Sequence, residues 1–168
     1  MSDLRVHKTK YINETKRVSF KYDGKNYFGY EGDTLASALL ANGVHLIGRS
    51  FKYHRPRGIM SCGSEEPNAI CQISDKNDLT EPNVRATELE IYDGLEAFSQ
   101  NCWPNVKFDI GGINNLISPL IPAGFYYKTF MWPKSFWKKV YEPLIRMSAG
   151  LGKSPSEADP DIFDHDCV

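Results

Sequence analysis

One segment of this 168-residue chain, "RSFKYHRPRGIMSCGSEEPNAIC" at residues 49–71, concentrates side chains that could do chemistry. It contains four cations, one histidine and two cysteines: Arg49, Lys52, His54, Arg55, Arg57, Cys62 and Cys71. Thiols can ligate an iron–sulfur cluster, and guanidinium groups can bind phosphate or carboxylate oxygens. The spacing decides between these uses.

The cysteine spacing does not fit a metal site. A plant-type 2Fe–2S loop needs C-x4-C-x2-C and a distant fourth cysteine. Counted from Cys62, the second and third ligand positions fall on Pro67 and Ile70, which cannot bind iron. Cys71 lies one residue too far, and strand alternation would turn its thiol to the opposite face. No C-x2-C pair suits zinc. We therefore expect no metal, apolar packing in place of a cluster, and a spectator thiol at Cys62, with unusual cluster ligation as the alternative.

The basic run has several possible roles. Arg55 and Arg57 are candidates for a contact with a cofactor phosphate, another domain or another subunit. Alternatively, this is a solvated loop whose arginines pair with the nearby Glu65 and Glu66. We expect His54 to make a structural hydrogen bond, and we assign no catalytic residue to the chain.

The elements that position this segment begin with a hairpin. From Arg17, the pattern alternates through Val18, Phe20 and Tyr22, turns at Asp23–Gly24 and becomes apolar again. Alternation on both sides of an Asp-Gly turn predicts two antiparallel strands.

A short helix follows, over residues 35–42. Asp33 or Thr34 can cap its start, Leu35 and Leu39 lie one turn apart on one face, and Gly43 ends it.

Two further strands are predicted beyond the loop, at "NAICQIS" (68–74) and "RATELEIY" (85–92). The order strand, strand, helix, long loop, strand, strand predicts an α+β fold, a small β-grasp sheet packed on one helix. We assign residues 16–100 to this domain and 1–15 to an N-terminal arm.

The composition changes after residue 100. Residues 101–152 are rich in proline and aromatic residues, with one predicted helix from Ser135 to about Met147 that follows Pro133. Large apolar side chains gather around it: Phe130, Met131, Trp132, Phe136 and Trp137. We expect this extension to contact another domain or subunit, or else to form a second local core. Residues 153–168 are polar and contain proline, which predicts a linker that leads toward a further strand.

The net charge and the distribution of apolar residues indicate which classes of partner the chain does not bind. Twenty basic and twenty-one acidic residues give a net charge of -1, which argues against nucleic acid or anionic lipid as a general partner. No apolar run approaches the ~18 residues of a membrane span, and no signal peptide is recognisable. We expect a cytoplasmic protein that binds neither nucleic acid nor membrane.

Three blocks carry a resemblance to a known family: "GDTLASALLANGVHLIGRSFKYHRPRGIMSCGSEEPNA", "SQNCWP" and "AGFYYKTFMWPKSFW". They closely resemble the N-terminal region of alpha subunits of heterotetrameric sarcosine oxidases. Related opine and other secondary-amine oxidases carry a similar "KYHRPRG" followed by cluster cysteines, whereas "GSEEPNA" resembles the sarcosine branch. The resemblance implies a ferredoxin-like grasp domain that has lost its cluster ligands.

The resemblance also implies a larger enzyme. Such enzymes oxidise sarcosine to glycine with H2O2, releasing formaldehyde or methylene-tetrahydrofolate. FAD, FMN, NAD and tetrahydrofolate would be expected in the full complex, with no cofactor in this segment. The resemblance also implies that residues 153–168 are a linker into a Rossmann domain. The implied partners are the remaining alpha-subunit domains and the beta, gamma and delta subunits. This segment would be a non-catalytic scaffold.

Overall fold

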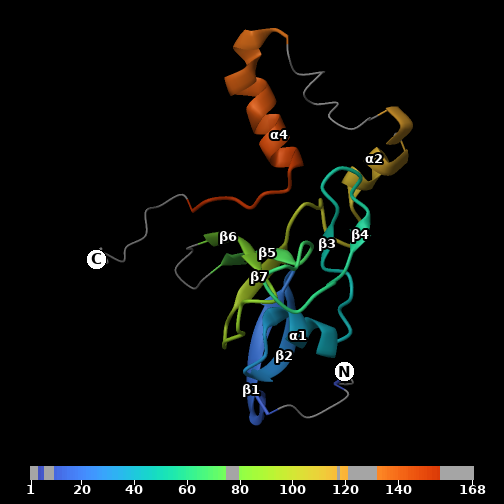
Figure 1. Ribbon diagram of the computed structural model, residues 1–168. Coiled ribbons are helices and arrows are strands. Elements are labelled where there is room, and N and C mark those ends of the chain that lie inside the picture. The colour runs from blue at the N-terminus through green and yellow to red at the C-terminus, as the bar shows by residue number, and fades with distance from the viewer. Residues whose placement is uncertain (1–3, 6–9, 75–79, 117, 121–131, 156–168) are drawn as a thin grey trace, which may run out of the picture.

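A computed structural model describes residues 4–5, 10–74, 80–116, 118–120 and 132–155. Five strands form one mixed sheet in the order β2-β1-β7-β5-β6. Their bounds are β1 Asn13–Tyr22, β2 Lys25–Glu31, β5 Ile70–Ser74, β6 Thr80–Arg85 and β7 Glu96–Ser99. The central pair, β1 and β7, is parallel, and the other neighbouring strands are antiparallel. Helix α1 (Leu35–Ala41) packs beside β2 (Figure 1). The predicted α+β grasp-type fold is confirmed.

The β1–β2 hairpin forms because its alternation matches a sheet with one buried face. Val18, Phe20 and Tyr22 are buried, and the residues between them are exposed. The turn needs two positive φ angles, 48° at Asp23 and 73° at Gly24, which suit an Asp-Gly pair. The Asp23 carboxylate also accepts hydrogen bonds from the backbone N–H and hydroxyl of Ser99, at the end of β7. The turn therefore fixes the central parallel pair.

Helix α1 is almost wholly buried, as its composition predicts. Leu35 and Leu39 are fully enclosed by the sheet, and Gly43 (φ 74°) follows the helix end. Thr34 is the cap, because its hydroxyl accepts the Ser37 N–H at 3.2 Å. Asp33 has a different role, as a buried carboxylate bound to Arg5.

The prediction of a strand at residues 85–92 is wrong. Strand β6 ends at Arg85, and a turn follows it. The carbonyl of Ala86 accepts the Ala36 N–H, and that of Leu89 accepts the Leu35 N–H, at 2.8 Å each. This segment therefore satisfies the first amide groups of α1, which have no partner inside the helix. The fifth strand is β7, which the sequence pattern does not predict.

The basic loop contains a small hairpin of its own. Strand β3 (Gly48–Arg49) pairs antiparallel with β4 (Pro56–Arg57), apart from the main sheet. Figure 1 shows this hairpin beside the sheet, close to the chain that continues from β7.

Where the structure describes it, the extension after β7 contains short helical segments. They are η1 Ile110–Gly112, α2 Ile113–Leu116, η2 Ser118–Leu120, η3 Lys134–Phe136, η4 Trp137–Tyr141 and α4 Glu142–Ser148. The last three form the predicted helix, which contains a π-helical turn at Trp137–Tyr141. After α4 the chain returns to the sheet, where the Gln72 side chain exchanges two hydrogen bonds with the backbone of Lys153.

The extension does not form a second core among the described residues. Val106 is the buried hydrophobic residue found there, whereas Trp103 and Phe108 are each 68% exposed and Leu116 is 80% exposed. Trp132 is 82% exposed, and Phe136 and Trp137 are about half exposed; Phe130 and Met131 lie outside the described residues. We call these exposed side chains together the unburied apolar surface of the extension.

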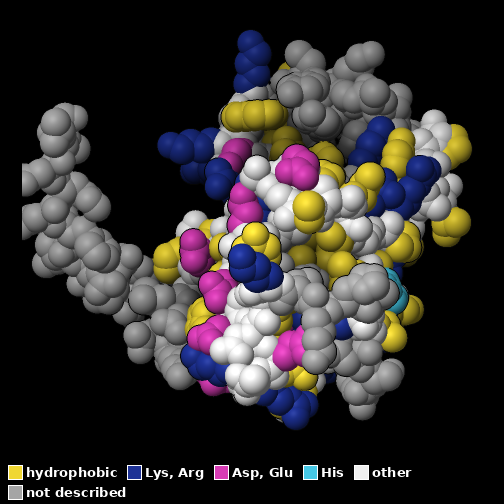
Figure 2. All heavy atoms as spheres, turned by 60° about the horizontal axis from the view of Figure 1, so that its bottom comes forward, with side chains coloured by type: hydrophobic (Ala, Val, Ile, Leu, Met, Phe, Trp, Pro, Cys, Tyr) yellow, Lys and Arg dark blue, Asp and Glu magenta, His cyan; other side chains and the backbone are white. Residues whose placement is uncertain are grey.

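Charged side chains of both signs are exposed on the described part of the surface (Figure 2). On the face shown in Figure 2, Lys and Arg side chains alternate with acidic and apolar ones. In the part of the chain that the structure describes, no helix is both long and apolar enough to span a bilayer.

Candidate functional site

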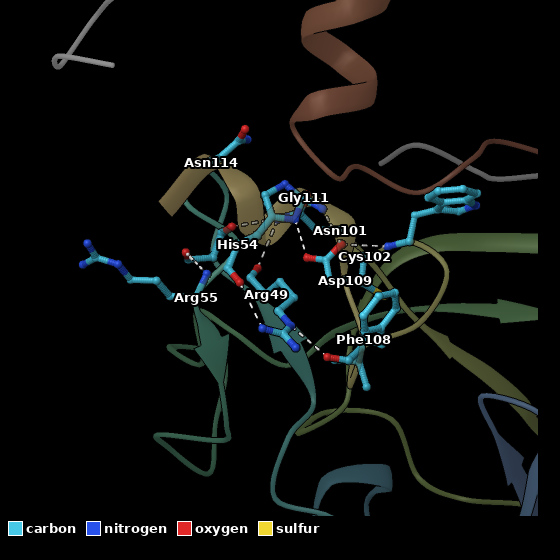
Figure 3. Close-up of polar contacts among 12 residues, drawn as sticks. Arg49, His54, Arg55, Asn101, Cys102, Phe108, Asp109, Gly111 and Asn114 are labelled. Atoms are coloured by element: carbon cyan, nitrogen blue, oxygen red, sulfur yellow. Dashed lines mark hydrogen bonds and ion pairs between the residues drawn. The ribbon is translucent and has the colours of Figure 1, made fainter. Parts of the chain in front are cut away.

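The basic loop is held by a buried histidine–aspartate pair. His54, which has a φ of 52°, lies at the tip of the β3–β4 hairpin. Its Nδ1 lies 2.6 Å from Oδ2 of Asp109, whose side chain is 1% exposed (Figure 3). The other Asp109 oxygen accepts the N–H groups of Trp103 and Gly111. The structural hydrogen bond expected of His54 is present, and it joins the loop to the start of the extension.

Arg49 strengthens the same junction. Its guanidinium donates to the carbonyls of Val106 and Lys107, at 2.8 and 2.9 Å, and to that of His54 at 3.2 Å. The side-chain amide of Asn101 donates a hydrogen bond to the carbonyl of Arg49. This arginine is therefore committed to the backbone of its own chain, and it is not available to a phosphate.

Arg55 and Arg57, the two candidate contact residues, are exposed. Arg55 Nε donates to Asn115 Oδ1 at 2.8 Å, and its guanidinium lies 4.9 Å from the centre of the Tyr53 ring. No ion pair joins either arginine to a carboxylate among the described residues, so the alternative in which they pair with Glu65 and Glu66 is not observed. Both cations keep donors that can face a partner, and their contact role stays a prediction.

The residues of the cluster loop do not fit an iron–sulfur cluster. Cys62 is exposed, Pro67 is exposed and Ile70 is half-buried in β5. Cys71 lies in the core, where burial raises the pKa of its thiol to about 12, so it stays protonated. Within the described ranges, no group of three or more His, Cys, Asp or Glu side chains could hold a metal.

The amide groups of this loop turn toward the side chain of Glu66. Its carboxylate is buried and accepts backbone N–H groups of the loop itself. We expected apolar packing in this loop, but closely spaced amides need an acceptor, which aliphatic groups cannot provide and Glu66 does.

The site lacks the parts of a hydrolytic or transfer centre. His54 and Asp109 could supply a base and its orienting carboxylate. However, no hydrogen bond within the described part of the chain joins the His54 ring to a serine or cysteine. Cys102 is half-buried, burial raises the pKa of its thiol, and it lies 3.2 Å from the Ser99 hydroxyl. The arrangement holds segments together and presents Arg55 outward.

Asp109 and Glu66 were missed as structural residues of the site. Asp109 carried a usable signal, because Asp before Ile-Gly-Gly is typical of a helix cap, and its side chain does accept the Gly111 N–H of η1. Glu66 carried no local signal, since its amide partners lie in a loop of irregular structure.

Replacing Asp109 with alanine should loosen the junction. Three hydrogen bonds to a buried carboxylate are lost, so we expect the free energy of unfolding to fall by about 1–3 kcal/mol. Urea unfolding measures this loss, and limited proteolysis should show faster cleavage within 101–116. Asn105→Ala is the control, since the exposed Asn105 caps the same segment but does not contact His54. Equal effects of the two substitutions would contradict the assigned role of Asp109.

Comparison with known proteins gives a consistent family. The 2Fe-2S iron-sulfur cluster binding domain family matches residues 15–102. The chain is 57% identical over 164 residues to the sarcosine oxidase subunit alpha of Rhizobium meliloti (strain 1021), covering 98% of this chain and 16% of that protein. It is 41% identical over 88 residues to the sarcosine oxidase subunit alpha of Corynebacterium sp. (strain U-96), covering 51% of this chain and 9% of that protein.

The crystal structure of L-proline dehydrogenase from P. horikoshii is also similar. It matches with a TM-score of 0.41 and 24% identity, over 60% of this chain and 18% of that one. The chain spans 16% and 9% of the lengths of the two sarcosine oxidase subunits described above. On the match that covers the sheet, helix and loop described above, this chain belongs to the 2Fe-2S iron-sulfur cluster binding domain family.

Proposed function

We propose that this chain is the N-terminal segment of the alpha subunit of a sarcosine oxidase and acts there as a non-catalytic scaffold. The observation that carries the proposal is the 57% identity with a sarcosine oxidase subunit alpha over 98% of the chain. The absence of a nucleophile–base pair and of cluster ligands among the described residues supports a structural role.

The complete enzyme would oxidise sarcosine to glycine with O2, giving H2O2 and formaldehyde or methylene-tetrahydrofolate. FAD, FMN, NAD and tetrahydrofolate would be held by the rest of a cytoplasmic heterotetramer with beta, gamma and delta subunits. In this chain, residues 16–100 would form the grasp domain, 101–152 the contact extension and 153–168 the linker to a Rossmann domain. Residues 1–15 would form the arm.

The unburied apolar surface of the extension is the part that would contact the remaining enzyme. Trp103, Phe108 and Leu116 expose most of their side chains, and the first two lie in the segment that leads to Asp109. Arg55 extends away from Phe108 in Figure 3 and contacts Asn115, and Arg57 lies in β4; both add charge for an acidic partner. Apolar side chains surrounded by polar ones are typical of an interface between domains or subunits.

A second candidate function is electron transfer through a 2Fe–2S cluster, which the family match favours. The donor set opposes it, because Pro67 and Ile70 occupy the second and third ligand positions. An absorbance spectrum and iron analysis of the purified protein distinguish the two: visible iron–sulfur bands with about two irons per chain would require the cluster.

A related opine or other secondary-amine oxidase differs from the first proposal only in substrate, which steady-state assays of the whole enzyme would identify.

The scaffold proposal predicts an assembly defect without a folding defect. We expect the double substitution Phe108→Ser and Leu116→Ser to weaken co-purification with the rest of the alpha subunit and the other subunits, because burying both side chains contributes about 1.5–3 kcal/mol each. The isolated chain should melt at the unchanged temperature and form no H2O2 with sarcosine. Tyr11→Ser removes another exposed ring, 85% accessible, far from the extension in sequence and serves as the control. Full assembly of the double variant, or sarcosine-dependent H2O2 from the chain alone, would contradict the proposal.

A further inference from the structure

The loop that carries the three nominal cluster positions closes around one side chain, that of Glu66. Its exposed fraction is 1%. Oε2 accepts the N–H groups of Met60 and Ser61 at 2.7 and 2.6 Å, and Oε1 accepts the N–H of Asn68 at 2.8 Å. Backbone amides from both sides of residue 66 therefore point inward at one carboxylate.

The rest of the loop is arranged to keep Glu66 in this position. The Glu66 N–H donates to the carbonyl of Gly63 at 3.2 Å. The same carbonyl accepts the hydroxyl of Thr87, a buried residue of the turn that covers α1. The Glu66 backbone is thus fixed within the loop, and the loop is tied to the turn after β6.

Convergent amides need an acceptor and favour an anion. Successive backbone N–H groups that point into one concavity create a positive potential, which in many proteins is occupied by a phosphate or an iron–sulfur centre. Amides left without an acceptor in a buried position would cost about 1–3 kcal/mol each. In a 2Fe–2S domain, hydrogen bonds to the cluster sulfurs help set its properties. Here Pro67 and Ile70 remove the ligands, but inward-facing amides are still present in the loop.

We infer that the Glu66 carboxylate is a built-in anion that holds the loop 60–69 in shape in place of an iron–sulfur cluster, so that the loop is complete without metal. The proposal rests on the three hydrogen bonds and the burial of Glu66. It does not depend on which enzyme the chain belongs to.

The ionisation of Glu66 agrees with this geometry. Burial opposes the charged form, but hydrogen bonds from the N–H groups of Ser61, Asn68, Met60 and Ala69 outweigh it and lower the pKa of this carboxyl below its ordinary 4.5. The side chain is therefore an anion at neutral pH.

The test measures amide exchange in the 168-residue chain by NMR. Glu66→Ala should accelerate hydrogen exchange at Met60, Ser61 and Asn68 by ~10-fold or more, because each loses its acceptor. Glu66→Gln should give a smaller acceleration, since its amide oxygen can accept on one side only, and this variant decides the question if Glu66→Ala does not fold. Glu65→Ala is the matched control, because the adjacent Glu65 is exposed.

Two additions separate an anion site from simple loss of packing. Sodium formate should slow exchange at these amides in Glu66→Ala more than sodium chloride of equal ionic strength, because formate restores the missing carboxylate. Treatment of the unmodified chain with EDTA should leave their exchange unchanged. Exchange in both Glu66 variants equal to that in Glu65→Ala, no difference between formate and chloride, or loop opening on EDTA treatment would each overturn the proposal.

Discussion

Replacement of Asp33 with alanine should lower the free energy of unfolding by about 3–5 kcal/mol, the cost typical of breaking a buried ion pair. The Asp33 side chain is fully buried, and its carboxylate accepts from the Arg5 guanidinium, the Tyr30 N–H at 2.9 Å and the Ser37 hydroxyl at 2.8 Å. The substitution leaves the largely buried Arg5 without its carboxylate. Urea or thermal unfolding of the purified chain measures the loss.

The neighbouring Thr34 supplies the control. Thr34→Ala removes only the hydroxyl that caps α1, which should cost about 1 kcal/mol. From the sequence, both residues are candidate caps with the same small effect, whereas the structure predicts a difference of several-fold. Similar losses for Asp33→Ala and Thr34→Ala would show that the Arg5–Asp33 pair does not stabilise the fold.

The Arg5–Asp33 ion pair also makes the stability of the fold sensitive to acid. Burial opposes ionisation of Asp33, but the hydrogen bonds from Arg5, Tyr30 and Ser37 lower its pKa below the ordinary 3.8. A carboxyl with a lowered pKa stabilises the fold above its unfolded pKa and loses that contribution as the pH falls through its folded pKa. The unmodified chain should therefore lose more stability below about pH 4 than Asp33→Asn does.

The second large effect is expected at Leu39. This side chain is fully buried between α1 and the sheet, in one core with Phe20, Ile73 and Leu95. Leu39→Ala should lower the free energy of unfolding by about 2–5 kcal/mol, through lost burial and the cavity that remains. Thermal and urea unfolding give the value.

The next residue along the helix is the matched control. Leu40 has the same side chain in the same helix but is 37% exposed, so Leu40→Ala should cost less, about 1 kcal/mol or below. Equal losses at the two positions would mean that the inward face of α1 has been assigned incorrectly.

The parts of the fold predicted correctly from the sequence are those governed by local rules. Alternation through Val18, Phe20 and Tyr22 fixes which face of β1 is buried, and the Asp23–Gly24 pair supplies the positive φ angles of the turn. The enclosed face of α1 and its end near Gly43 follow in the same way. Each of these features depends on residues a few positions apart.

The loop 60–69 shows what can and cannot be predicted from the sequence in this way. Counting from Cys62 was enough to show that Pro67 and Ile70 cannot ligate iron, because ligand identity is a property of the residue itself. The acceptor that fills the loop, Glu66, could not be found by counting, since its hydrogen bonds depend on how the backbone of Met60 to Asn68 is folded.

The sequence by itself therefore determined the class of fold, the hairpin, the helix and the loss of cluster ligands. Only the tertiary structure decided that residues 86–89 serve the amide groups of α1, that Asp33 pairs with Arg5 across 28 residues, and that His54 meets Asp109 across 55. The physical reason is that a buried polar group needs a partner, but any distant segment of suitable chemistry can supply it. Which one does so is fixed only when the chain is packed.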